Sequence, residues 1–480
     1  MKNLAIHARN LLLAMPVSYG DARAVETVVE TIQVKNGVPQ SVTFTTSHGI
    51  GVRVIAGGCW GFASTGTMTK SAVGKVCRQA LKIAESSAVA LVKAVELTPV
   101  DAVEAVYATP VTEDPFAVPL EEKLSLLTRA DKAMSGEPMV KVRQSYYQGW
   151  RRRSVFASTE GSLIEQEIVQ TGGGIAATAV GAGDTQVRSY PNSFRGNFHS
   201  AGFEYFRELD LARQGQRVAA EAAALIAAPT LPEGARTVIL DGGQLALQVH
   251  ESIGHPTELD RVLGMEAAYA GTSFLTLDKL NTLRYGSEIV NVVADATAPG
   301  GLGTFGFDDE GVPAKRVDLI RDGRFVGYQT SRETAGAVGE GSNGTMRADG
   351  WNRIPLVRMT NINLLPGTWK FGDLLADSDD AIYMATNRAW SIDNKRLNFQ
   401  FGAEIAYEVK GGKLTKMYKN PSYTGITPEF WNSCDAVCGE ADWIMWGTPN
   451  CGKGQPGQTA RVGHGTAPSR FRNVRVGVVR

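Results

Sequence analysis

Two features that would point to a membrane or a nucleic acid are missing from this chain: a long apolar run and an excess of charge of one sign. No run of about 18 apolar residues occurs in it, and a membrane-spanning helix needs a run of that length. Neither sign of charge is in excess, because Lys plus Arg and Asp plus Glu number 49 each. A neutral chain exerts no general attraction on nucleic acid or on an anionic membrane. We therefore expect a protein with neither kind of partner.

Cysteine is scarce, and its positions are scattered. The five cysteines are Cys59, Cys77, Cys434, Cys438 and Cys451. An odd number of widely spaced cysteines does not make a disulfide framework and is typical of a reducing compartment. The apolar run LLLAM near the start is shorter than the roughly 7–15 residues of a signal-peptide core, and no A-x-A-like site follows it. We therefore expect an amphipathic surface helix at the start and a cytoplasmic protein.

Glycine, by contrast, is abundant, and strand and helix patterns follow one another between the glycines without regular alternation. Residues 23–65 alternate apolar and polar side chains between turn residues, which predicts an antiparallel meander. Apolar side chains recur at helical spacing in 71–88, and a second helix is expected near 120–134. Further strands follow, with the TGGG segment at 171–174 as a turn, before an Ala-rich helix at 217–228.

The second half of the chain is dominated by strands and turns. The pairs Asp322-Gly323 and Gly411-Gly412 each stand between alternating segments and predict two hairpins with two-residue turns. The segment PTLPEGAR is the best candidate for a domain boundary. We predict an α+β protein of two domains. Residues 1–228 would form a mixed antiparallel sheet with helices, and residues 229–480 a mainly antiparallel domain that carries the histidine motif described next.

The segment LQVHESIGHPTELD contains the pattern H-E-x-x-x-H, formed by His250, Glu251 and His255. In the H-E-x-x-H helix of zinc proteases, the histidines are four residues apart and share one face. Here the spacing is one residue longer, and positions five apart on a regular helix diverge by about 140°. Two departures from a regular helix would bring the histidines together. Gly254 can end the helix in the left-handed conformation, with Pro256 disfavouring the helical region at His255, or the helix can widen into a π-turn.

The residues before the motif predict a strand, a Gly-Gly turn and a helix. Leu245, Val249 and Ile253 lie four apart and form the stripe that we expect to be buried. His250 and Glu251 lie off that stripe. The alternative interpretation is a surface His-Glu pair near a helix end, followed by a histidine that merely precedes a turn.

Several segments in a fixed order point to a known family. They are GVRVIAGGCWGFAST (51–65), VFASTEGSLIEQE (155–167), VHESIGHPTELD (249–260), RMTNINLLPG (358–367) and NCGKGQPGQTARVGHGTAPSRFRNVRVG (450–477). In this order they resemble the TldD/PmbA family of zinc metalloproteases, which also carries the label "modulator of DNA gyrase". The likeness extends over nearly the whole chain. This chain differs from many members of the family in the segment PTELD, where those members have an acidic segment with more glycine.

The resemblance implies one zinc ion per chain, bound by His250, His255 and Cys451. Imidazole and thiolate are good zinc ligands, and a set of two histidines and one cysteine leaves a fourth position open. The resemblance also implies a dimer, formed by two copies or with a related non-catalytic member of the family. The site would lie in a cavity that admits a peptide or an unfolded protein. The non-catalytic branch lacks the histidine motif, which this chain retains.

Two functional hypotheses remain open. The first is a zinc peptidase that hydrolyses extended polypeptides, with Glu251 as the catalytic base that takes a proton from water and returns it to the leaving amine. The second is a non-enzymatic protein-binding or modulating subunit with a structural or vestigial metal site. Glu251 favours the first, because a structural zinc site is filled by its ligands and needs no adjacent carboxylate.

Other groups allow weaker interpretations. Cys451 and His464 could form a thiol nucleophile with its base, although no orienting Asn or Asp is evident. Cys434 and Cys438 could bind a metal, but buried structural cysteines are favoured. The acidic runs DDE (308–310) and DSDD (377–380) are expected to be solvated loops. The WRRR segment (150–153) is expected to be a strand face or an interface contact.

Overall fold

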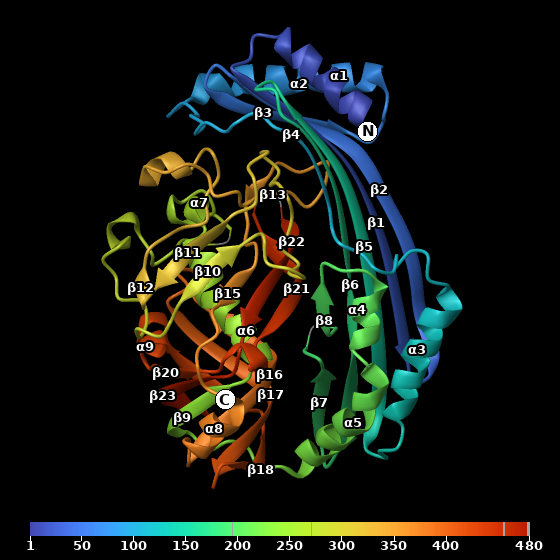
Figure 1. The fold of residues 1–480 in the computed structure, drawn as a ribbon, viewed down its shortest axis with the longest axis vertical. Coiled ribbons are helices and arrows are strands. Elements are labelled where there is room, and N and C mark those ends of the chain that lie inside the picture. Colours follow the sequence, from blue (N-terminus) through green and yellow to red (C-terminus); the bar gives the residue numbers. More distant parts are fainter. Residues whose placement is uncertain (194, 270, 455–456, 478–480) are drawn as a thin grey trace.

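One eight-stranded sheet is built from the first half of the chain, and its long strands run along one side of the molecule in Figure 1. The computed structural model describes residues 1–193, 195–269, 271–454 and 457–477. The strands are β1 (Tyr19–Lys35), β2 (Val38–Ala56), β3 (Cys59–Thr65), β4 (Glu104–Ala108), β5 (Val140–Ser158), β6 (Leu163–Gly181), β7 (Asp184–Tyr190) and β8 (Asn197–His199). Their order is β3-β2-β1-β5-β6-β4, and β7 and β8 also pair with β6. Only β4 and β6 are parallel neighbours, so the sheet is mixed.

Helices cover the two ends of this sheet. They are α1 (Lys2–Leu13), α2 (Lys70–Ser87), α3 (Leu120–Ala133), α4 (Phe203–Glu208) and α5 (Leu211–Ala227), with a 3-10 turn η1 (Ala88–Ala90) after α2. Figure 1 shows α1 and α2 over one end and α3 and α5 over the other. The first helix buries Ala5, Ala8 and Leu12 and exposes its other face, so the predicted amphipathic surface helix is confirmed. Among the described residues, no helix is both long and apolar enough to cross a membrane.

The TGGG segment is not a turn, and that prediction was wrong. Residues 171–174 lie in the middle of β6 and pair with β5 on one side and largely with β8 on the other. A Cβ atom on Gly172 would lie 2.1 Å from the carbonyl oxygen of Asn197, and one on Gly173 would lie 2.0 Å from that of Tyr146. These glycines therefore allow neighbouring backbones to approach closely, which is a tertiary requirement.

The second half of the chain forms several smaller sheets. Its strands are β9 (Gly234–Leu240), β10 (Val292–Asp295), β11 (Arg316–Arg321), β12 (Arg324–Phe325), β13 (Met346–Arg347), β14 (Leu356–Val357), β15 (Ile362–Leu364), β16 (Ala381–Ile392), β17 (Asn398–Lys410), β18 (Lys413–Lys419), β19 (Ser422–Ile426), β20 (Cys434–Val437), β21 (Ile444–Lys453), β22 (Gln458–Thr466) and β23 (Ser469–Val476). Its helices are α6 (Gly242–Val249), η2 (His250–Gly254), η3 (His255–Thr257), α7 (Leu259–Val262), η4 (Leu277–Lys279), η5 (Ala335–Val338), α8 (Phe371–Ala376), α9 (Thr427–Asn432) and η6 (Glu440–Asp442). Strands dominate this half, so the predicted α+β class is confirmed.

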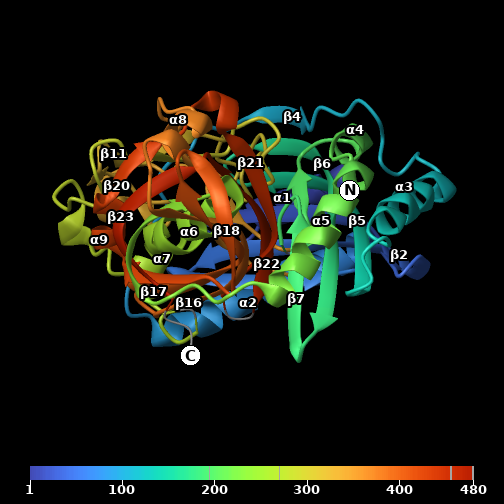
Figure 2. The same cartoon turned by 90° about the horizontal axis from the view of Figure 1, so that it is seen from below.

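A closed ring of strands surrounds α6. The sheet order is β16-β9-β23-β19-β17-β18, and an additional pairing of β16 with β17 closes the ring. Figure 2 shows α6 inside these strands. The predicted stripe of Leu245, Val249 and Ile253 is fully buried in the core that fills the ring. The ring therefore fixes the helix that carries the histidine motif. The division of the chain at residue 229 stays a prediction.

Both predicted hairpins are confirmed. Arg321 pairs with Arg324 across Asp322 and Gly323, and Lys410 pairs with Lys413 across Gly411 and Gly412. The turn residues have positive φ, as two-residue hairpin turns of this type require.

Buried ion pairs join the two halves of the chain. The DDE run is buried, so the prediction of a solvated loop was wrong. Asp309 Oδ1 lies 3.0 Å from Arg152 Nη2 on β5, and Glu310 Oε1 lies 3.3 Å from Arg53 Nη1 on β2. Asp309 and Glu310 are tolerated because arginines of the N-terminal sheet face them, whereas Asp308 accepts hydrogen bonds from the backbone N–H groups of Val312 and Met346. No local pattern reveals these partners.

The other charged runs behave as predicted. The aspartates of DSDD are exposed. The arginines of WRRR lie on β5 and form ion pairs with Asp114, Glu167 and Asp309. They are therefore strand-face and interface contacts.

Candidate metal centre

A single π-turn places the two motif histidines on one face. Asp241 caps α6, with its Oδ1 accepting a hydrogen bond from the backbone N–H of Gln244 at 2.8 Å. The helix then widens into the π-turn η2, where the N–H of His255 bonds to the carbonyl oxygen of His250. Such an i to i+5 bond stacks residues that are five positions apart. The two imidazole rings consequently lie 4.8 Å apart, centroid to centroid, at 87°.

The π-turn was one of the two predicted solutions, and the left-handed alternative was wrong. Gly254 has φ −58° and His255 has φ −62°, both in the right-handed helical region. Pro256 therefore does not remove His255 from the helix. Gly254 is required for a different reason, because a Cβ atom there would lie 2.2 Å from the Sδ atom of Met359.

Cys451 lies opposite the two histidines. The candidate ligand atoms of His250, His255 and Cys451 are all within 4.8 Å of one another, and all three residues are buried. Cys451 Sγ is 3.7 Å from His255 Nε2. The cysteine lies on β21 and pairs with Ala460 of β22. The structure thus brings the three predicted ligands together from a β-strand and a widened helix end.

The protonation of the three side chains suits metal binding. Burial lowers the pKa of both His250 and His255, which keeps the imidazoles neutral. Burial alone would raise the pKa of the Cys451 thiol, but Arg358 and His255 lower it overall. Neutral imidazole and thiolate are the forms that bind zinc.

Polar groups behind the histidines fix which nitrogen faces the centre. His250 Nδ1 lies 2.8 Å from His464 Nε2, and His255 Nδ1 lies 3.0 Å from Glu258 Oε2. Each histidine therefore turns its Nε2 towards the other ligands. Lys453 in turn lies 3.4 Å from Glu258, so that buried carboxylate has a counter-ion.

Glu251 lies next to the candidate ligands, and its carboxylate is bonded to an arginine. Its Oε2 accepts a hydrogen bond from Arg396 Nη1, and the Glu251 side chain is buried while that of Arg396 is partly buried. Burial lowers the pKa of Arg396, while the charge of Glu251 opposes that effect. The carboxylate is therefore held in one orientation beside the two imidazoles.

A cavity of about 300 Å³ opens onto these groups. His250, Glu251, His255, Arg396 and Cys451 all line it. Its remaining lining residues come from both halves of the chain and include Asn192, Ser193, Gly196, Trp390, Trp446 and Gly447. The centre can therefore be reached by a ligand that enters between the two halves.

The other cysteine and histidine candidates do not join this centre. His464 contacts His250 and does not pair with Cys451 as a base would. Cys434 and Cys438 are buried in two different apolar clusters. Burial raises the pKa of Cys434 and raises that of Cys438 to about 12. Within the described part of the chain, His250, His255 and Cys451 form the one group of this kind that could hold a metal.

Two residues around the centre, Glu258 and Arg396, were missed at the sequence level, and His464 was considered only as a base for Cys451. Glu258 stands three positions after His255 and could have been found from that spacing, since a helical turn brings such pairs together. Arg396 and His464 carry no local signal. They come from β16–β17 and β22 and reach the centre only through the tertiary fold.

Sequence comparisons identify a family along most of the chain. The descriptions that match are PmbA/TldA metallopeptidase domain 1 at residues 20–84, the central domain at 113–226 and the C-terminal domain at 233–478. A metalloprotease of Methanocaldococcus jannaschii is 32% identical over 93% of this chain and 94% of that protein. A metalloprotease TldD homolog of Haemophilus influenzae is 26% identical over 93% of this chain and 90% of that protein.

Solved structures share the fold. A Thermotoga maritima protein labelled a modulator of a DNA gyrase matches with a TM-score of 0.78 and 17% identity, over 99% of both chains. TldE from Thermococcus kodakarensis matches with a TM-score of 0.72 and 15% identity, also over 99% of both chains. At these identities the likeness shows a common fold.

Proposed function

The chain belongs to the TldD/PmbA family of metallopeptidases, and we propose that it is a zinc-dependent peptidase that hydrolyses extended or unfolded polypeptides. The observation that carries the proposal is the convergence of two imidazoles and a thiol beside a carboxylate in one cavity. His250, His255 and Cys451 are the proposed ligands of one zinc ion, and Glu251 is the proposed catalytic base.

The donor set fits zinc. Two imidazole nitrogens and one thiolate are characteristic zinc ligands, and three protein ligands leave one position open for catalysis. Zinc bound there supplies a Lewis acid that polarises a carbonyl group and makes water more acidic. Glu258 and His464 support the fit, because each holds the rear nitrogen of one histidine and so fixes its tautomer.

The proton transfers are assigned to Glu251. Its carboxylate takes a proton from the attacking water and later delivers it to the nitrogen of the leaving amine. Arg396 holds Oε2 of this carboxylate, which leaves Oε1 to accept the proton. As a cation in the same cavity, Arg396 also stabilises the negative charge that develops on the carbonyl oxygen during attack.

An extended peptide is the proposed substrate because of the strand that borders the cavity. Gly447, Thr448, Pro449, Asn450, Cys451 and Gly452 of β21 line the cavity. Among the described strands, β21 is paired with β22 alone, and on its other edge the N–H of Gly447 is bonded to the Asn197 side chain. A peptide can add to such an edge through backbone hydrogen bonds, which recognise the extended form with little sequence preference.

A second candidate function is a non-enzymatic binding subunit with a structural metal site. The contact between Arg396 and Glu251 favours it, because the guanidinium occupies one oxygen of the carboxylate that a catalytic base would offer to water.

Replacement of Glu251 by Gln distinguishes the two functions. Glu251→Gln retains the size of the side chain and its contact with Arg396 but removes the base. We expect the variant to fold, bind zinc and bind peptide, and to lose at least ~10²-fold in kcat for an unstructured peptide. Hydrolysis is measured by chromatography of the products, and zinc by elemental analysis of the same sample.

Glu288→Gln is the matched control, because the Glu288 side chain is 80% exposed and lies outside the cavity. It should leave kcat unchanged. A Glu251→Gln protein with full zinc and unaltered kcat would reject the mechanism and favour the binding subunit.

We also propose that the chain acts as a dimer, with a second copy or with a related non-catalytic member of the family. The shared fold with TldE supports a partner of the same architecture. Light scattering of the active protein should give at least twice the mass of the chain. Full activity in a strictly monomeric sample would contradict the dimer.

A further inference from the structure

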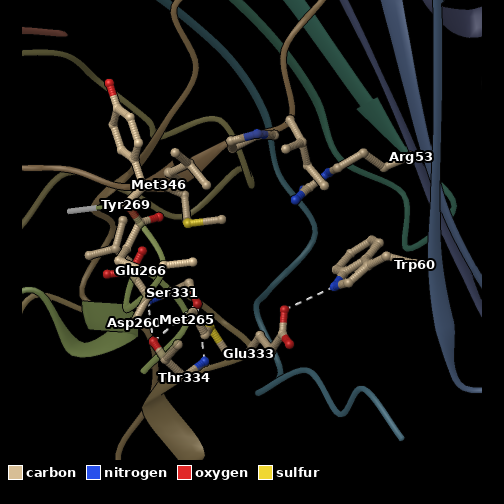
Figure 3. Close-up of a pocket in the computed structure, with 15 residues that line it drawn as sticks. Arg53, Trp60, Asp260, Met265, Glu266, Tyr269, Ser331, Glu333, Thr334 and Met346 are labelled. Atoms are coloured by element: carbon tan, nitrogen blue, oxygen red, sulfur yellow. Dashed lines mark hydrogen bonds between the residues drawn. The ribbon is translucent and has the colours of Figure 1, made fainter. Parts of the chain in front are cut away.

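A second cavity, of about 290 Å³, lies between the two halves of the chain. Figure 3 shows Arg53 and Trp60 entering from the N-terminal sheet, while Asp260, Glu266 and Tyr269 come from the C-terminal half, around and after α7. It shares no lining residue with the cavity at the metal centre. The proposed peptidase mechanism makes no use of it.

Glu266 is the least satisfied group in this second cavity. The residue is only 6% exposed, and its Oε2 atom has no hydrogen-bond partner among the described residues. Burial raises the pKa of the Glu266 carboxyl, although the charge of Lys453 opposes this effect. A buried carboxylate is costly unless a cation pairs with it. The position is therefore prepared for a positive group that the chain itself does not supply.

The cations around Glu266 are already engaged. Lys453 donates hydrogen bonds to Asp260 Oδ1 and Oδ2 at 2.7 and 2.9 Å. Arg261 Nε lies 3.6 Å from Glu258 Oε2, and Arg53 on the cavity wall is paired with Asp21 at 2.6 Å. Each of these cations therefore already has a carboxylate partner other than Glu266.

Glu333 adds a second carboxylate to the cavity. Its Oε2 accepts a hydrogen bond from Trp60 Nε1 at 2.9 Å, which is a neutral donor (Figure 3). In the part of the chain that the structure describes, no ion pair of Glu333 occurs within 4.0 Å. The cavity therefore carries an excess of negative charge.

The rim offers apolar surface beside these carboxylates. Met265 is 56% exposed and Tyr269 is 63% exposed, which is unusual for side chains of this size. A thioether and an aromatic ring pack well against methylene groups, and the ring face also attracts a cation. This combination suits a group with an aliphatic stem and a positive end.

We propose that this cavity binds the ammonium or guanidinium group of a lysine or arginine side chain on a polypeptide, with Glu266 and Glu333 as counter-ions. The inference rests on the proposed peptidase function, since the polypeptide bound here is the substrate, held at a point away from the cleaved bond. A polypeptide is a better occupant than a free amine, because Met265 and Tyr269 can cover the stem of the side chain and the adjoining backbone.

Binding is tested on the full chain after treatment with a chelator, so that no hydrolysis occurs. The probes are an acetylated pentapeptide amide, Gly-Gly-Lys-Gly-Gly, and the same peptide with norleucine in place of lysine. Calorimetry should give a Kd at least ~10-fold lower for the lysine peptide, as expected for a charge-assisted contact. Glu266→Gln should abolish this preference, and Glu333→Gln should reduce it. Glu85→Gln, at an exposed position of α2, should preserve it.

The source of the positive group is tested with n-butylammonium and spermidine. We expect both to bind more weakly than the lysine peptide by at least ~10-fold. Tighter binding of spermidine than of the peptide would overturn the polypeptide assignment. Equal affinity for the lysine and norleucine peptides, or an unchanged preference in Glu266→Gln protein with a normal unfolding midpoint, would overturn the site itself. Because these measurements use metal-depleted protein, their outcome is independent of whether Glu251 catalyses hydrolysis.

Discussion

Each proposed zinc ligand is supported from behind by a buried polar group. His464 holds His250, Glu258 holds His255, and Arg358 Nη2 donates a hydrogen bond to the carbonyl oxygen of Cys451 at 2.5 Å. Such contacts fix ring orientation and ligand basicity, and they commonly change metal affinity by about 10–100-fold.

Loss of the thiol should remove most of the bound zinc. Cys451→Ser retains a small polar side chain, but a hydroxyl is a far poorer zinc ligand than a thiolate. We expect affinity for zinc to fall by at least ~10²-fold, beyond the usual effect of an outer contact. Competition with a chromophoric chelator measures this affinity.

Cys59→Ser is the control for that measurement, since Cys59 lies at the start of β3 and lines neither cavity. It should bind zinc as the wild type does. Full zinc content in Cys451→Ser protein under competition would exclude Cys451 as a ligand.

At the level of the element, the π-turn decides whether the two histidines of the motif can face one metal site. An α-helix would direct His250 and His255 to different sides, whereas the turn η2 stacks them. The turn is held by the ring of strands around α6 and by the packing of Gly254 against Met359. The wider turn is thus fixed by its surroundings.

A methyl group at Gly254 should disturb this turn. Gly254→Ala places its Cβ 2.2 Å from the Sδ of Met359, which is fully buried and cannot move away freely. We expect a loss of about 1–3 kcal/mol in the free energy of unfolding and weaker zinc binding. Urea unfolding measures the first, and chelator competition measures the second.

Two further variants identify the cause. Gly372→Ala in α8 has nothing within 4 Å of the new Cβ and should lose no stability. Met359→Ala combined with Gly254→Ala should show a favourable coupling of about 1 kcal/mol, because the clash is then absent. Additive effects of the two changes would refute the proposed contact.

At the level of the whole molecule, buried charges hold the N-terminal sheet against the C-terminal half. Asp309 is central, since it contacts Arg152 and also accepts a hydrogen bond from the backbone N–H of Ala348 at 2.7 Å. Burial raises its pKa, but Arg152 and Arg23 outweigh burial, and the pKa is lowered to about 2. The cavity at the metal centre is lined by residues of the same two halves.

Asp309→Asn should lower the free energy of unfolding by about 3–5 kcal/mol at neutral pH, because it leaves buried arginines without their carboxylate partner. The free energy of unfolding should also depend more strongly on pH in the wild type than in the variant. A carboxyl with a lowered folded-state pKa stabilises the fold above its unfolded value of about 3.9, and this contribution is lost as pH falls towards 2. Between pH 5 and 3, we expect the wild type to lose about 1 kcal/mol more than the variant in urea unfolding.

The exposed Asp380 provides the control, with a side chain that is 79% exposed. Asp380→Asn should keep the stability and the pH dependence of the wild type. Identical pH dependence in Asp309→Asn and the wild type would show that Asp309 does not titrate with folding.

Local sequence patterns were sufficient to predict the hairpins, the helix that carries the motif and the histidines and carboxylate of the site. Turn residues with positive φ, the apolar stripe of α6 and the spacing of the histidine motif all act over a few residues, so the hairpins, the helix and the π-turn could be predicted. The resemblance of separate segments also brought Cys451 into the set of proposed ligands. These inferences succeed because short-range geometry limits what the backbone can do.

Long-range packing settled the rest. TGGG was interpreted as a turn and DDE as a solvated loop because glycine and acidic runs usually occur there. The glycines instead allow the backbone of β8 to approach closely, and Asp309 and Glu310 are paired with arginines more than a hundred positions earlier in the chain. Arg396, His464 and Glu266 acquire their roles in the same way. Whether a buried polar group is paired or left for a ligand depends on what the fold brings beside it, and sequence neighbours carry no information about that.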